Sequence, residues 1–471
     1  MSSDIKRRDF IKKVGIAGAA VTIVPRHVLG RGFVAPSDTF YMGGVGAGGK
    51  GFSNLTGCAE SKNVKIAALC DVDDERAKKA VGQFKNAKYY QDYRKMLDTE
   101  SGLDGVIVST PDHMHAIQAL DAMQRGKHVY VEKPLTHDIH EARQMTEAAH
   151  KYKVVTQMGN QGASGDGVRK MQEWYQANVI GDVEEVWCWT DRPVWPQGIP
   201  WPSEKAKIPK TLNWDLWLGT APQKNYVDNL VPFNWRGWWD YGTGALGDMA
   251  CHIIEPAFKT LELGYPVSVE CSVGSVYVGE FRRGYFPDSC PPSSHITLMF
   301  PERNGKPPVK MHWMDGGIQP ARPEELEANA VMGDGGNGVI MRGSKGVIMC
   351  DTYGRNPRLL PVSMNDYVNV PEKLPRVPEG HHLQWVNAAM AGYKKAETSS
   401  DFDIAGPLTE SILMGNLAIR SFDYRVKNKE NPDRWDYPGR YIKLLWDGPN
   451  MKVTNFDPAN ALVKRDYRTG W

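Results

Sequence analysis

The chain of 471 residues is longer than one hydrophobic core usually extends, so we expect two domains, each large enough to fold. Its 57 Lys and Arg against 55 Asp and Glu give a formal net charge of +2, without the basic excess of nucleic-acid-binding proteins. Its seven Cys include no C-x-x-C pair, so we expect buried thiols, with no metal site and no disulfide framework.

The N-terminal residues are typical of a secretion signal. Lys6–Lys13 contains paired arginines before a Phe-Ile step, and a short apolar run follows over residues 14–24. This layout is that of a twin-arginine export signal. Because the run is shorter than the ~20 residues that span a bilayer, we expect no permanent membrane anchor. We predict a signal segment over residues 1–33 and a periplasmic protein; a cytoplasmic protein with a basic tail is the alternative.

A glycine-rich segment follows the first expected strand, over residues 38–42. It fits the pattern G-x-G-x-x-G at Gly44, Gly46 and Gly49. Glycines let the backbone turn tightly and approach a pyrophosphate, and the next helix directs free N–H groups at the phosphates. The segment therefore predicts a dinucleotide site.

A second apolar strand, over residues 64–70, ends at Asp71, which follows Gly49 by 22 residues. An acid at this place in a dinucleotide-binding domain holds the adenosine ribose hydroxyls, and its charge repels a 2′-phosphate. We therefore expect NAD as the cofactor and consider NADP disfavoured.

Strands and helices then alternate, which predicts a doubly wound parallel sheet over residues 34–160. The expected elements are a helix over 74–84, a strand over 105–108, a helix after 113, a strand over 128–131 and a short strand at 154–155. Ligands of such sheets bind beyond the carboxyl ends of the strands. The cofactor-binding residues expected there are Ser109, Thr110, Pro111, His113, His115, Glu132, Lys133 and Gln161.

The Glu-Lys-Pro-Leu stretch at 132–135 lies between an apolar strand and a helix over 140–150. In this setting the sequence resembles the Gfo/Idh/MocA oxidoreductases, and the resemblance covers nearly the whole chain after the signal. The resemblance implies that Lys133 lies beside the nicotinamide and the substrate hydroxyl, and that Pro134 follows a cis peptide bond.

A second motif of that family lies at 242–252, where a glycine-rich stretch leads into a helix. Asp248 and His252 are four residues apart and share one face of that helix. The resemblance implies that both are catalytic. Glu255 stands where relatives commonly carry an Asp, so no third catalytic carboxylate is assigned.

Aromatic residues precede this second motif. Arg236, Trp238 and Tyr241 are expected to contact substrate, and many of the 15 Trp lie between Trp174 and Trp239. Tryptophans stack on sugar rings but also fill ordinary cores, and the sequence leaves both open.

The resemblance also implies an α/β domain over residues 161–471 with a large, open, mainly antiparallel sheet. One face of that sheet would cover the active site. The other face often forms a dimer interface, so we expect a homo-oligomer, either a dimer or a tetramer.

Hydride removal from an alcohol carbon requires a base for the hydroxyl proton. We expect His252 to exchange the proton, Asp248 to orient its ring or hold a sugar hydroxyl, and Lys133 to polarise the reacting oxygen. The roles of Lys133 and His252 could be exchanged.

The predicted function is that of an NAD-dependent oxidoreductase acting on a secondary alcohol carbon of a sugar or glycoside, with C3 of a pyranoside as the first candidate. One alternative is an NAD-dependent glycoside hydrolase or lyase that works through a transient keto sugar. Another is a non-catalytic protein that binds NAD or sugar. Since free NAD is scarce outside the cytoplasm, we expect the cofactor to be tightly bound.

Overall fold

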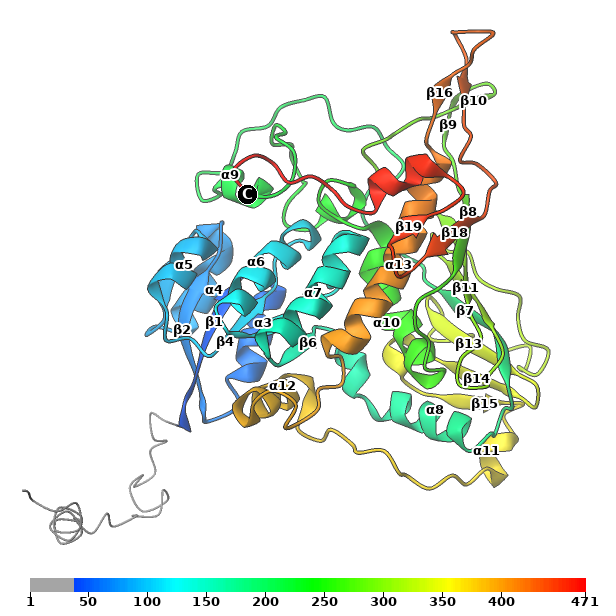
Figure 1. Ribbon diagram of the computed structural model, residues 1–471, viewed down its shortest axis with the longest axis horizontal. Helices are drawn as coiled ribbons and strands as arrows, with labels where there is room; N and C mark the ends of the chain where they lie inside the picture. The colour runs from blue at the N-terminus through cyan, green and yellow to red at the C-terminus, as the bar shows by residue number, and fades with distance from the viewer. Residues whose placement is uncertain (1–37) are drawn as a thin grey trace, which may run out of the picture. The chain divides into compact units, whose positions relative to one another are not determined.

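The computed structural model describes residues 38–471, so the predicted signal segment at 1–33 lies outside the described residues. Two large sheets organise the compact unit Phe40–Trp471 (Figure 1). The last strand of the first sheet ends at Met158 and the first strand of the second begins at Val183. The domain boundary at 160 stays a prediction.

The first sheet is parallel throughout its described strands and has the order β3-β2-β1-β4-β5-β6. The strands are β1 (Phe40–Val45), β2 (Val64–Cys70), β3 (Lys88–Tyr90), β4 (Gly105–Val108), β5 (His128–Val131) and β6 (Thr156–Met158). This is the order of the doubly wound Rossmann sheet, which binds dinucleotides where the order reverses, beyond β1 and β4. The predicted N-terminal fold is confirmed.

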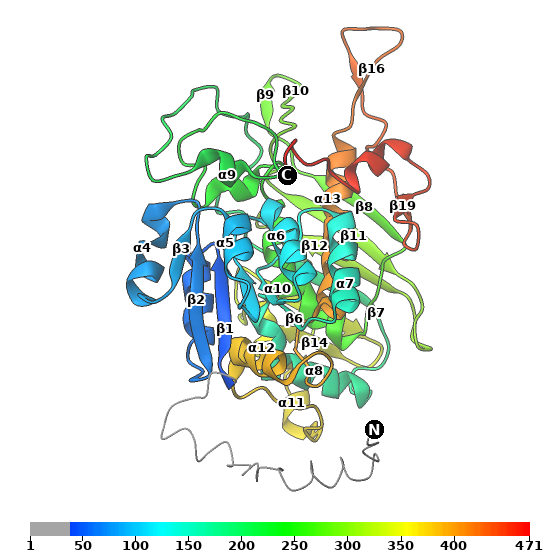
Figure 2. The same cartoon turned by 60° about the vertical axis from the view of Figure 1, so that its left-hand side comes forward.

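Helices cover both faces of this sheet (Figures 1 and 2). They are α3 (Lys50–Cys58), α4 (Asp74–Gln83), α5 (Tyr93–Thr99), α6 (Asp112–Gln124) and α7 (Ile139–Tyr152). Side-chain caps begin three of them, at Asp73, Asp92 and Asp138, and Asp138 with Glu141 completes a capping box. One more helix comes from far along the chain, because α12 (Gly380–Ala391) packs beside α3 and buries Trp385 against Phe40 and Tyr130.

The second sheet has the order β15-β14-β13-β7-β12-β11-β8-β18-β19, and β7 with β12 is the one parallel pair among its described strands. The strands are β7 (Val183–Trp189), β8 (Ser268–Val273), β11 (Ser294–Phe300), β12 (Val309–Met314), β13 (Gly338–Gly343), β14 (Val347–Cys350), β15 (Arg358–Leu360), β18 (Leu444–Asp447) and β19 (Lys452–Val453). The prediction of a mainly antiparallel second sheet is thus confirmed.

Two long helices, α10 (Gly244–Thr260) and α13 (Phe402–Phe422), pack on one face of the second sheet. Strand β11 alternates buried and half-buried residues, so its apolar side chains meet these helices while every second residue faces the other way. Nearly every residue of α10 is buried, which places the predicted catalytic helix in the interior of the protein.

Smaller elements complete the chain. They are α8 (Asp166–Gln176), α9 (Trp214–Leu218), α11 (Met364–Tyr367), the hairpin strands β9 (Tyr277–Gly279) and β10 (Arg282–Arg283), the hairpin strands β16 (Val426–Lys427) and β17 (Trp435–Asp436), and short 3-10 turns that include η2 (Gln161–Ser164), η3 (Asn234–Gly237), η4 (Thr352–Gly354) and η5 (Asp457–Leu462). The two hairpins project from the same end of the unit (Figures 1 and 2).

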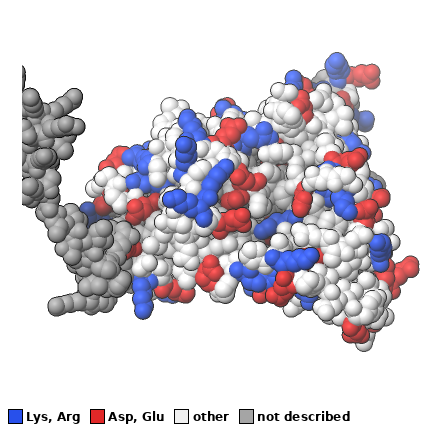
Figure 3. Space-filling view, turned by 60° about the horizontal axis from the view of Figure 1, so that its bottom comes forward, with Lys and Arg blue, Asp and Glu red and all other residues white. Residues whose placement is uncertain are grey.

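Charged side chains lie on the surface, whereas the cysteines lie mostly in the interior. Acidic and basic side chains are interspersed on the face that Figure 3 presents. All seven Cys are free thiols, and Cys271 is the least buried of them. Within residues 38–471, no helix is long and apolar enough to cross a membrane, and no group of three His, Cys, Asp or Glu could hold a metal ion.

Candidate active site

The glycine turn between β1 and α3 forms one wall of a cavity of about 710 Å³. Gly46 begins the turn with φ +77°, and a methyl group on it would lie 2.6 Å from the Ser109 carbonyl oxygen. A methyl group on Gly51 would lie 1.8 Å from the Gly46 carbonyl oxygen, so only glycine lets α3 start this close to the turn. Gly48 lines the cavity between them.

The predicted register of the glycine motif therefore needs a correction of two residues. Gly44 lies inside β1 against Leu55, and Gly49 is the N-cap of α3; neither lines the cavity. The pattern G-x-G-x-x-G also fits Gly46, Gly48 and Gly51, and these three have the turn, the cavity wall and the close helix packing that the motif requires.

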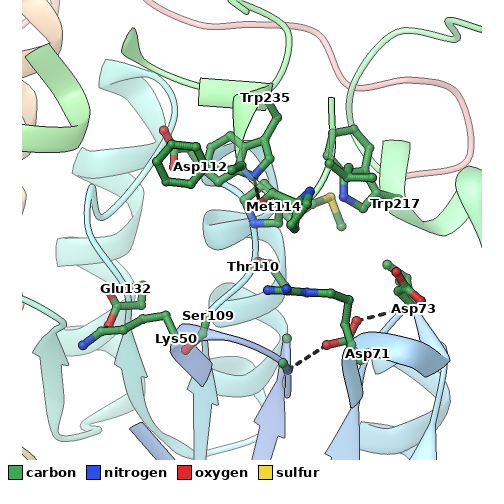
Figure 4. A pocket seen from close by; sticks show the side chains of 18 of the residues that line it. Lys50, Asp71, Asp73, Ser109, Thr110, Asp112, Met114, Glu132, Trp217 and Trp235 are labelled. Carbon is green, nitrogen blue, oxygen red and sulfur yellow. Dashed lines mark hydrogen bonds and ion pairs between the residues drawn. The ribbon is translucent and has the colours of Figure 1, made fainter. Parts of the chain in front are cut away.

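Asp71 lies directly after β2 and faces the same turn. Its Oδ2 accepts a hydrogen bond from Gly48 N at 2.9 Å and its Oδ1 accepts one from Asp73 N at 3.0 Å (Figure 4). Burial raises the pKa of Asp71 to about 6, although both N–H donors lower it. Asp71 follows Gly51 by 20 residues and lines the cavity, as the ribose-binding acid of a dinucleotide site does.

Most of the other predicted cofactor residues line this cavity. They are Ser109, Thr110, Pro111, Glu132, Lys133 and Gln161. Asn54 fixes Glu132 by donating from Nδ2 to Oε1 at 2.8 Å. The glycine turn, the ribose acid and the strand-end residues thus form one cradle that fits a dinucleotide.

His113 and His115 do not reach the cavity, which corrects their predicted role. The ring nitrogens of His113 face the carbonyl oxygens of Tyr241 and Trp217, at 3.3 and 3.0 Å. Those of His115 face the carbonyl oxygens of Pro134 and Thr110, each at 2.7 Å. Both side chains are buried and hold loops together.

Lys133, at the end of β5, meets Asp248 on α10 across the cavity. Lys133 Nζ donates to Asp248 Oδ1 at 2.7 Å and to the Asp248 carbonyl oxygen at 2.8 Å. The bond between Lys133 and Pro134 is cis, as the resemblance implied. Arg236 shares the same carboxylate, with Nε 3.0 Å from Asp248 Oδ1. Two cations therefore converge on one buried anion.

This arrangement sets the charges of the site. Burial alone would lower the pKa of Lys133, but the Asp248 carboxylate outweighs it and raises the pKa above its usual value. Burial would raise the pKa of Asp248, but Lys133 and Arg236 hold it well below the usual range. The ammonium of Lys133 is therefore permanently charged near neutral pH.

His252 lies one helical turn beyond Asp248 and lines the same cavity. Its Nδ1 is 3.0 Å from Asn160 Oδ1, and since that oxygen accepts, Nδ1 carries the hydrogen and Nε2 keeps its lone pair. Burial and the charge of Lys133 lower the pKa of His252 well below its usual value. The imidazole is thus a neutral acceptor beside a charged ammonium.

Tyr353, in η4, packs its ring on His252, with centroids 4.6 Å apart and planes at 60°. It lines the cavity and has φ +66°, the left-handed conformation that non-glycine residues rarely adopt. Gly162 and Gly354 leave the room this turn needs. Strained backbone of this kind concentrates at functional sites.

Two family models match the parts of the chain that form this site. Residues 40–160 match a model described as oxidoreductase family, NAD-binding Rossmann fold, and residues 197–281 match one described as oxidoreductase family, C-terminal alpha/beta domain. Over these residues the chain belongs to the Gfo/Idh/MocA oxidoreductase family. Its cofactor is therefore NAD.

Curated relatives are similar over part of their length. An alpha-N-acetylgalactosaminidase of Shewanella oneidensis is 30% identical over 173 residues, covering 31% of this chain and 38% of that relative. A glycosyl hydrolase family 109 protein of Shewanella baltica matches with the same identity and coverage. The match thus spans well under half the length of these relatives.

Solved structures share the fold across most of the chain. The WlbA dehydrogenase of Chromobacterium violaceum, in complex with NADH and UDP-GlcNAcA, is 17% identical with a TM-score of 0.55, covering 82% of this chain and 95% of that one. A levoglucosan dehydrogenase in complex with NADH is 16% identical with a TM-score of 0.53, covering 81% and 98%. At these identities the likeness shows the Gfo/Idh/MocA fold.

The structure places only one of the three predicted substrate residues at the cavity. Arg236 lines the cavity, but Trp238 and Tyr241 do not. They are buried in an aromatic cluster in which Tyr241 contacts Trp217, with centroids 4.9 Å apart. The prediction that they contact substrate is corrected to a packing role.

Glu255 lies in α10, three residues after His252, at the place where the resemblance implies an Asp. It is 1% exposed, its oxygens accept no hydrogen bond from any described residue, and Lys259 Nζ lies 3.8 Å from Oε1. Burial raises its pKa to about 7. It does not line the cavity, so it supplies no third carboxylate to the site.

Sequence reasoning missed Asn160 and Tyr353, which hold His252 from two sides. Asn160 directly precedes the predicted Gln161, so position offered a signal for it. Tyr353 lies 101 residues beyond His252 in a segment without a motif, and only the turn Tyr353-Gly354 hints at a special backbone.

Proposed function

We propose that this protein is an NAD-dependent oxidoreductase that moves a hydride to or from a secondary alcohol carbon of a sugar or glycoside. One observation carries the proposal. The cavity lined by the glycine turn and Asp71 is also lined by Lys133 and His252, so a charged donor and a neutral acceptor lie beside the dinucleotide cradle.

The protonation states favour one division of roles. Oxidation of an alcohol removes a hydride from carbon and a proton from oxygen, and bound NAD takes the hydride. His252 Nε2 accepts the hydroxyl proton because it is neutral, with Nδ1 held by Asn160. Lys133 donates a hydrogen bond to the substrate oxygen as that oxygen becomes a carbonyl. Asp248 keeps the Lys133 ammonium charged.

The rest of the cavity wall suits a sugar. Trp195, Phe233 and Trp235 offer flat apolar surface, and the Arg236 guanidinium lies 4.3 Å from the Trp235 ring. Apolar faces beside charged donors match the faces and hydroxyls of a pyranose. The dehydrogenase solved in complex with UDP-GlcNAcA and the levoglucosan dehydrogenase support this class. C3 of a pyranoside remains our first candidate for the reacting carbon.

A second candidate is a glycosidase that oxidises its substrate transiently, eliminates the aglycone and returns the hydride to the sugar. The relatives named as alpha-N-acetylgalactosaminidase and glycosyl hydrolase family 109 favour it. The intact Glu-Lys-Pro lysine favours net dehydrogenation instead. A third candidate is NAD or sugar binding without turnover.

Export, retention and assembly belong to the same proposal. The paired arginines in Lys6–Lys13 support export by the twin-arginine route to the periplasm. An exported enzyme needs a cofactor that stays bound, so we propose tightly held NAD. The half-buried residues on the open face of β11 support a homo-oligomer, as a dimer or a tetramer.

The test is to incubate the purified protein with NAD and a panel of sugars and chromogenic glycosides, and to analyse the products by mass. Net dehydrogenation gives a keto sugar two hydrogens lighter together with NADH. Release of aglycone without net NADH supports the glycosidase. If neither product forms with any member of the panel, catalysis on sugars is contradicted and the binding protein is favoured.

A further inference from the structure

Residues 209–241 form a roof over the cavity, and most of its tryptophans pack within it. Trp214 and Trp217 stack with centroids 4.8 Å apart, and Trp217 meets Tyr241 at 4.9 Å. Residues of the roof that line the cavity include Leu212, Trp217, Tyr226 and Trp235. Trp217 and Trp235 lie across the cavity from Asp71 and Lys50 (Figure 4). The tryptophan-rich sequence is therefore both core and cavity wall.

The roof rests on the loop that follows the ribose acid. Asn213 N donates to the Val72 carbonyl oxygen at 2.8 Å, and Asp74 N donates to the Thr211 carbonyl oxygen at 3.0 Å. Val72 directly follows Asp71 and packs against the aromatic cluster of the roof. One edge of the roof is thus fixed beside the place where the adenosine ribose binds.

A second support lies at the start of α6. Thr220 Oγ1 donates to the His113 carbonyl oxygen at 2.7 Å, and His113 Nε2 lies 3.0 Å from the Trp217 carbonyl oxygen. The roof therefore spans the ends of β2 and β4, between which a dinucleotide lies in this fold. A dinucleotide bound in the cavity would therefore lie against the roof.

Residues 465–471, which we call the latch, cross the outside of the roof. Arg468 Nε donates to the Gly219 carbonyl oxygen at 3.0 Å, and its Nη2 donates to the Asp215 carbonyl oxygen at 2.9 Å. Arg465 Nη2 donates to Glu141 Oε1 at 2.8 Å and to the His113 carbonyl oxygen at 2.6 Å. The latch therefore ties the roof to α7 and α6 of the first sheet.

Trp471 ends the latch at the adenosine side of the cavity. Its ring lies 4.3 Å from the Arg94 guanidinium, which is itself bound to Asp92 at 2.9 Å. Trp471 lines the cavity together with Asp71, Asp92 and Tyr93. An aromatic ring held beside a guanidinium is a surface on which a purine base stacks.

We propose that the latch closes the roof over the adenosine half of NAD and that Trp471 is the stacking surface for the adenine. The latch then sets how slowly the cofactor leaves. The proposal requires NAD binding but no sugar chemistry, so it stands or fails independently of the substrate.

The test measures the dissociation of NADH from full-length protein by its fluorescence, with an excess of ADP-ribose as the trap. Trp471→Ala and Arg468→Ala should release NADH about tenfold faster than the parent, because stacking on one aromatic ring contributes about that factor. Trp471→Phe keeps an aromatic ring and should release NADH at close to the parental rate. Trp471→Leu keeps an apolar side chain without a ring and should release NADH as fast as Trp471→Ala.

Two controls make the result specific. Trp435→Ala removes another half-exposed Trp, which lies 4.1 Å from the Arg425 guanidinium on a projecting hairpin, and should leave the NADH rate unchanged. Reduced nicotinamide mononucleotide lacks the adenosine half, so its affinity should be equal in all variants. The proposal is overturned if Trp471→Leu and Arg468→Ala release NADH at the same rate as Trp435→Ala. It is also overturned if these two variants lower the affinity for the mononucleotide as much as the affinity for NADH.

Discussion

At the scale of single residues, the site is organised by one carboxylate. Asp248 holds Lys133 and Arg236 through the same Oδ1 atom, at 2.7 and 3.0 Å. Because all three side chains are largely buried, the carboxylate decides the charge of the lysine. Burial, together with the charge of the lysine, in turn lowers the pKa of His252 and keeps its ring neutral. A proton acceptor and a fixed hydrogen-bond donor can then coexist at the same pH.

The charge states predict a level pH profile. His252 must be neutral to act, and its pKa lies below the ordinary 6.5, whereas Lys133 must be charged, and its pKa lies above the ordinary 10.5. Between these two values both conditions hold. Hydride transfer, followed in single turnovers, should therefore be nearly independent of pH from about 7 to 9. A rate that climbs tenfold per pH unit across this range would instead identify neutral Lys133 as the base.

Asp248→Asn should lower both the free energy of unfolding and the pKa of Lys133. Removing one partner of a buried ion pair costs about 3 kcal/mol in the free energy of unfolding. Since the pKa of Asp248 is lowered by folding, the loss should be complete at neutral pH and fade below about pH 4. Thermal unfolding at several pH values measures it. Glu325→Gln, which breaks the more exposed pair with Arg342, should cost less than about 1 kcal/mol; equal losses would contradict the account.

Substitutions of Tyr353 test its left-handed backbone and its ring contact with His252 separately. Tyr353→Asn suits the left-handed backbone, so the free energy of unfolding should change by no more than about 1 kcal/mol. Loss of the ring from His252 should nevertheless slow hydride transfer about tenfold and raise the pKa of His252 toward its usual value, as the acid limb of the rate profile would report. Tyr353→Phe keeps the ring and should retain both properties. If Tyr353→Asn transfers hydride at the parental rate, Tyr353 has no functional role in the site.

At the scale of elements, the end of strand β1 determines which glycines form the dinucleotide-binding turn. The run from Gly43 to Gly51 fits the dinucleotide pattern in two ways, and β1 decides between them by ending at Val45. The turn then begins at Gly46 and α3 starts against it. Only three-dimensional packing distinguishes Gly51, which the sequence-based register left out.

A pair of matched substitutions tests the register. Gly51→Ala forces a methyl group against the Gly46 carbonyl oxygen and should lower NADH affinity at least tenfold. Gly82→Ala in α4 meets nothing within 4 Å and should stabilise the protein by up to about 1 kcal/mol without changing affinity. Isothermal titration with NADH compares them. Parental affinity in Gly51→Ala would restore the register at Gly44, Gly46 and Gly49.

Local patterns in the sequence predicted the elements that such patterns specify. Alternation of apolar strands and polar helices indicated the first sheet, and the motifs placed Lys133, Asp248 and His252 on the right elements. His113 and Tyr241 were assigned to ligands because they stand near functional residues in sequence, yet their side chains point into packed interior. Tyr353 and α12 reach the first sheet and its cavity from distant segments, and no local pattern records such long-range contacts.

At the scale of the whole unit, the cavity is built from segments that are far apart in the chain. The first sheet supplies the cradle, α10 supplies the acidic and imidazole groups, η4 supplies Tyr353, and residues 209–241 cover the top. Residues 465–471 return from the end of the described chain to bind α6, α7 and the roof. This enclosure is the structural basis for our proposal that NAD is tightly held.

The most direct test is a single-turnover measurement with saturating NAD and a sugar that the parent oxidises, following the appearance of NADH in Lys133→Met and His252→Ala. Both should bind NADH with parental affinity in a separate titration, and both should transfer hydride at least ~100-fold more slowly than the parent. Parental rates in both variants, with the cofactor bound, would contradict the claim that these two side chains act on the same substrate oxygen.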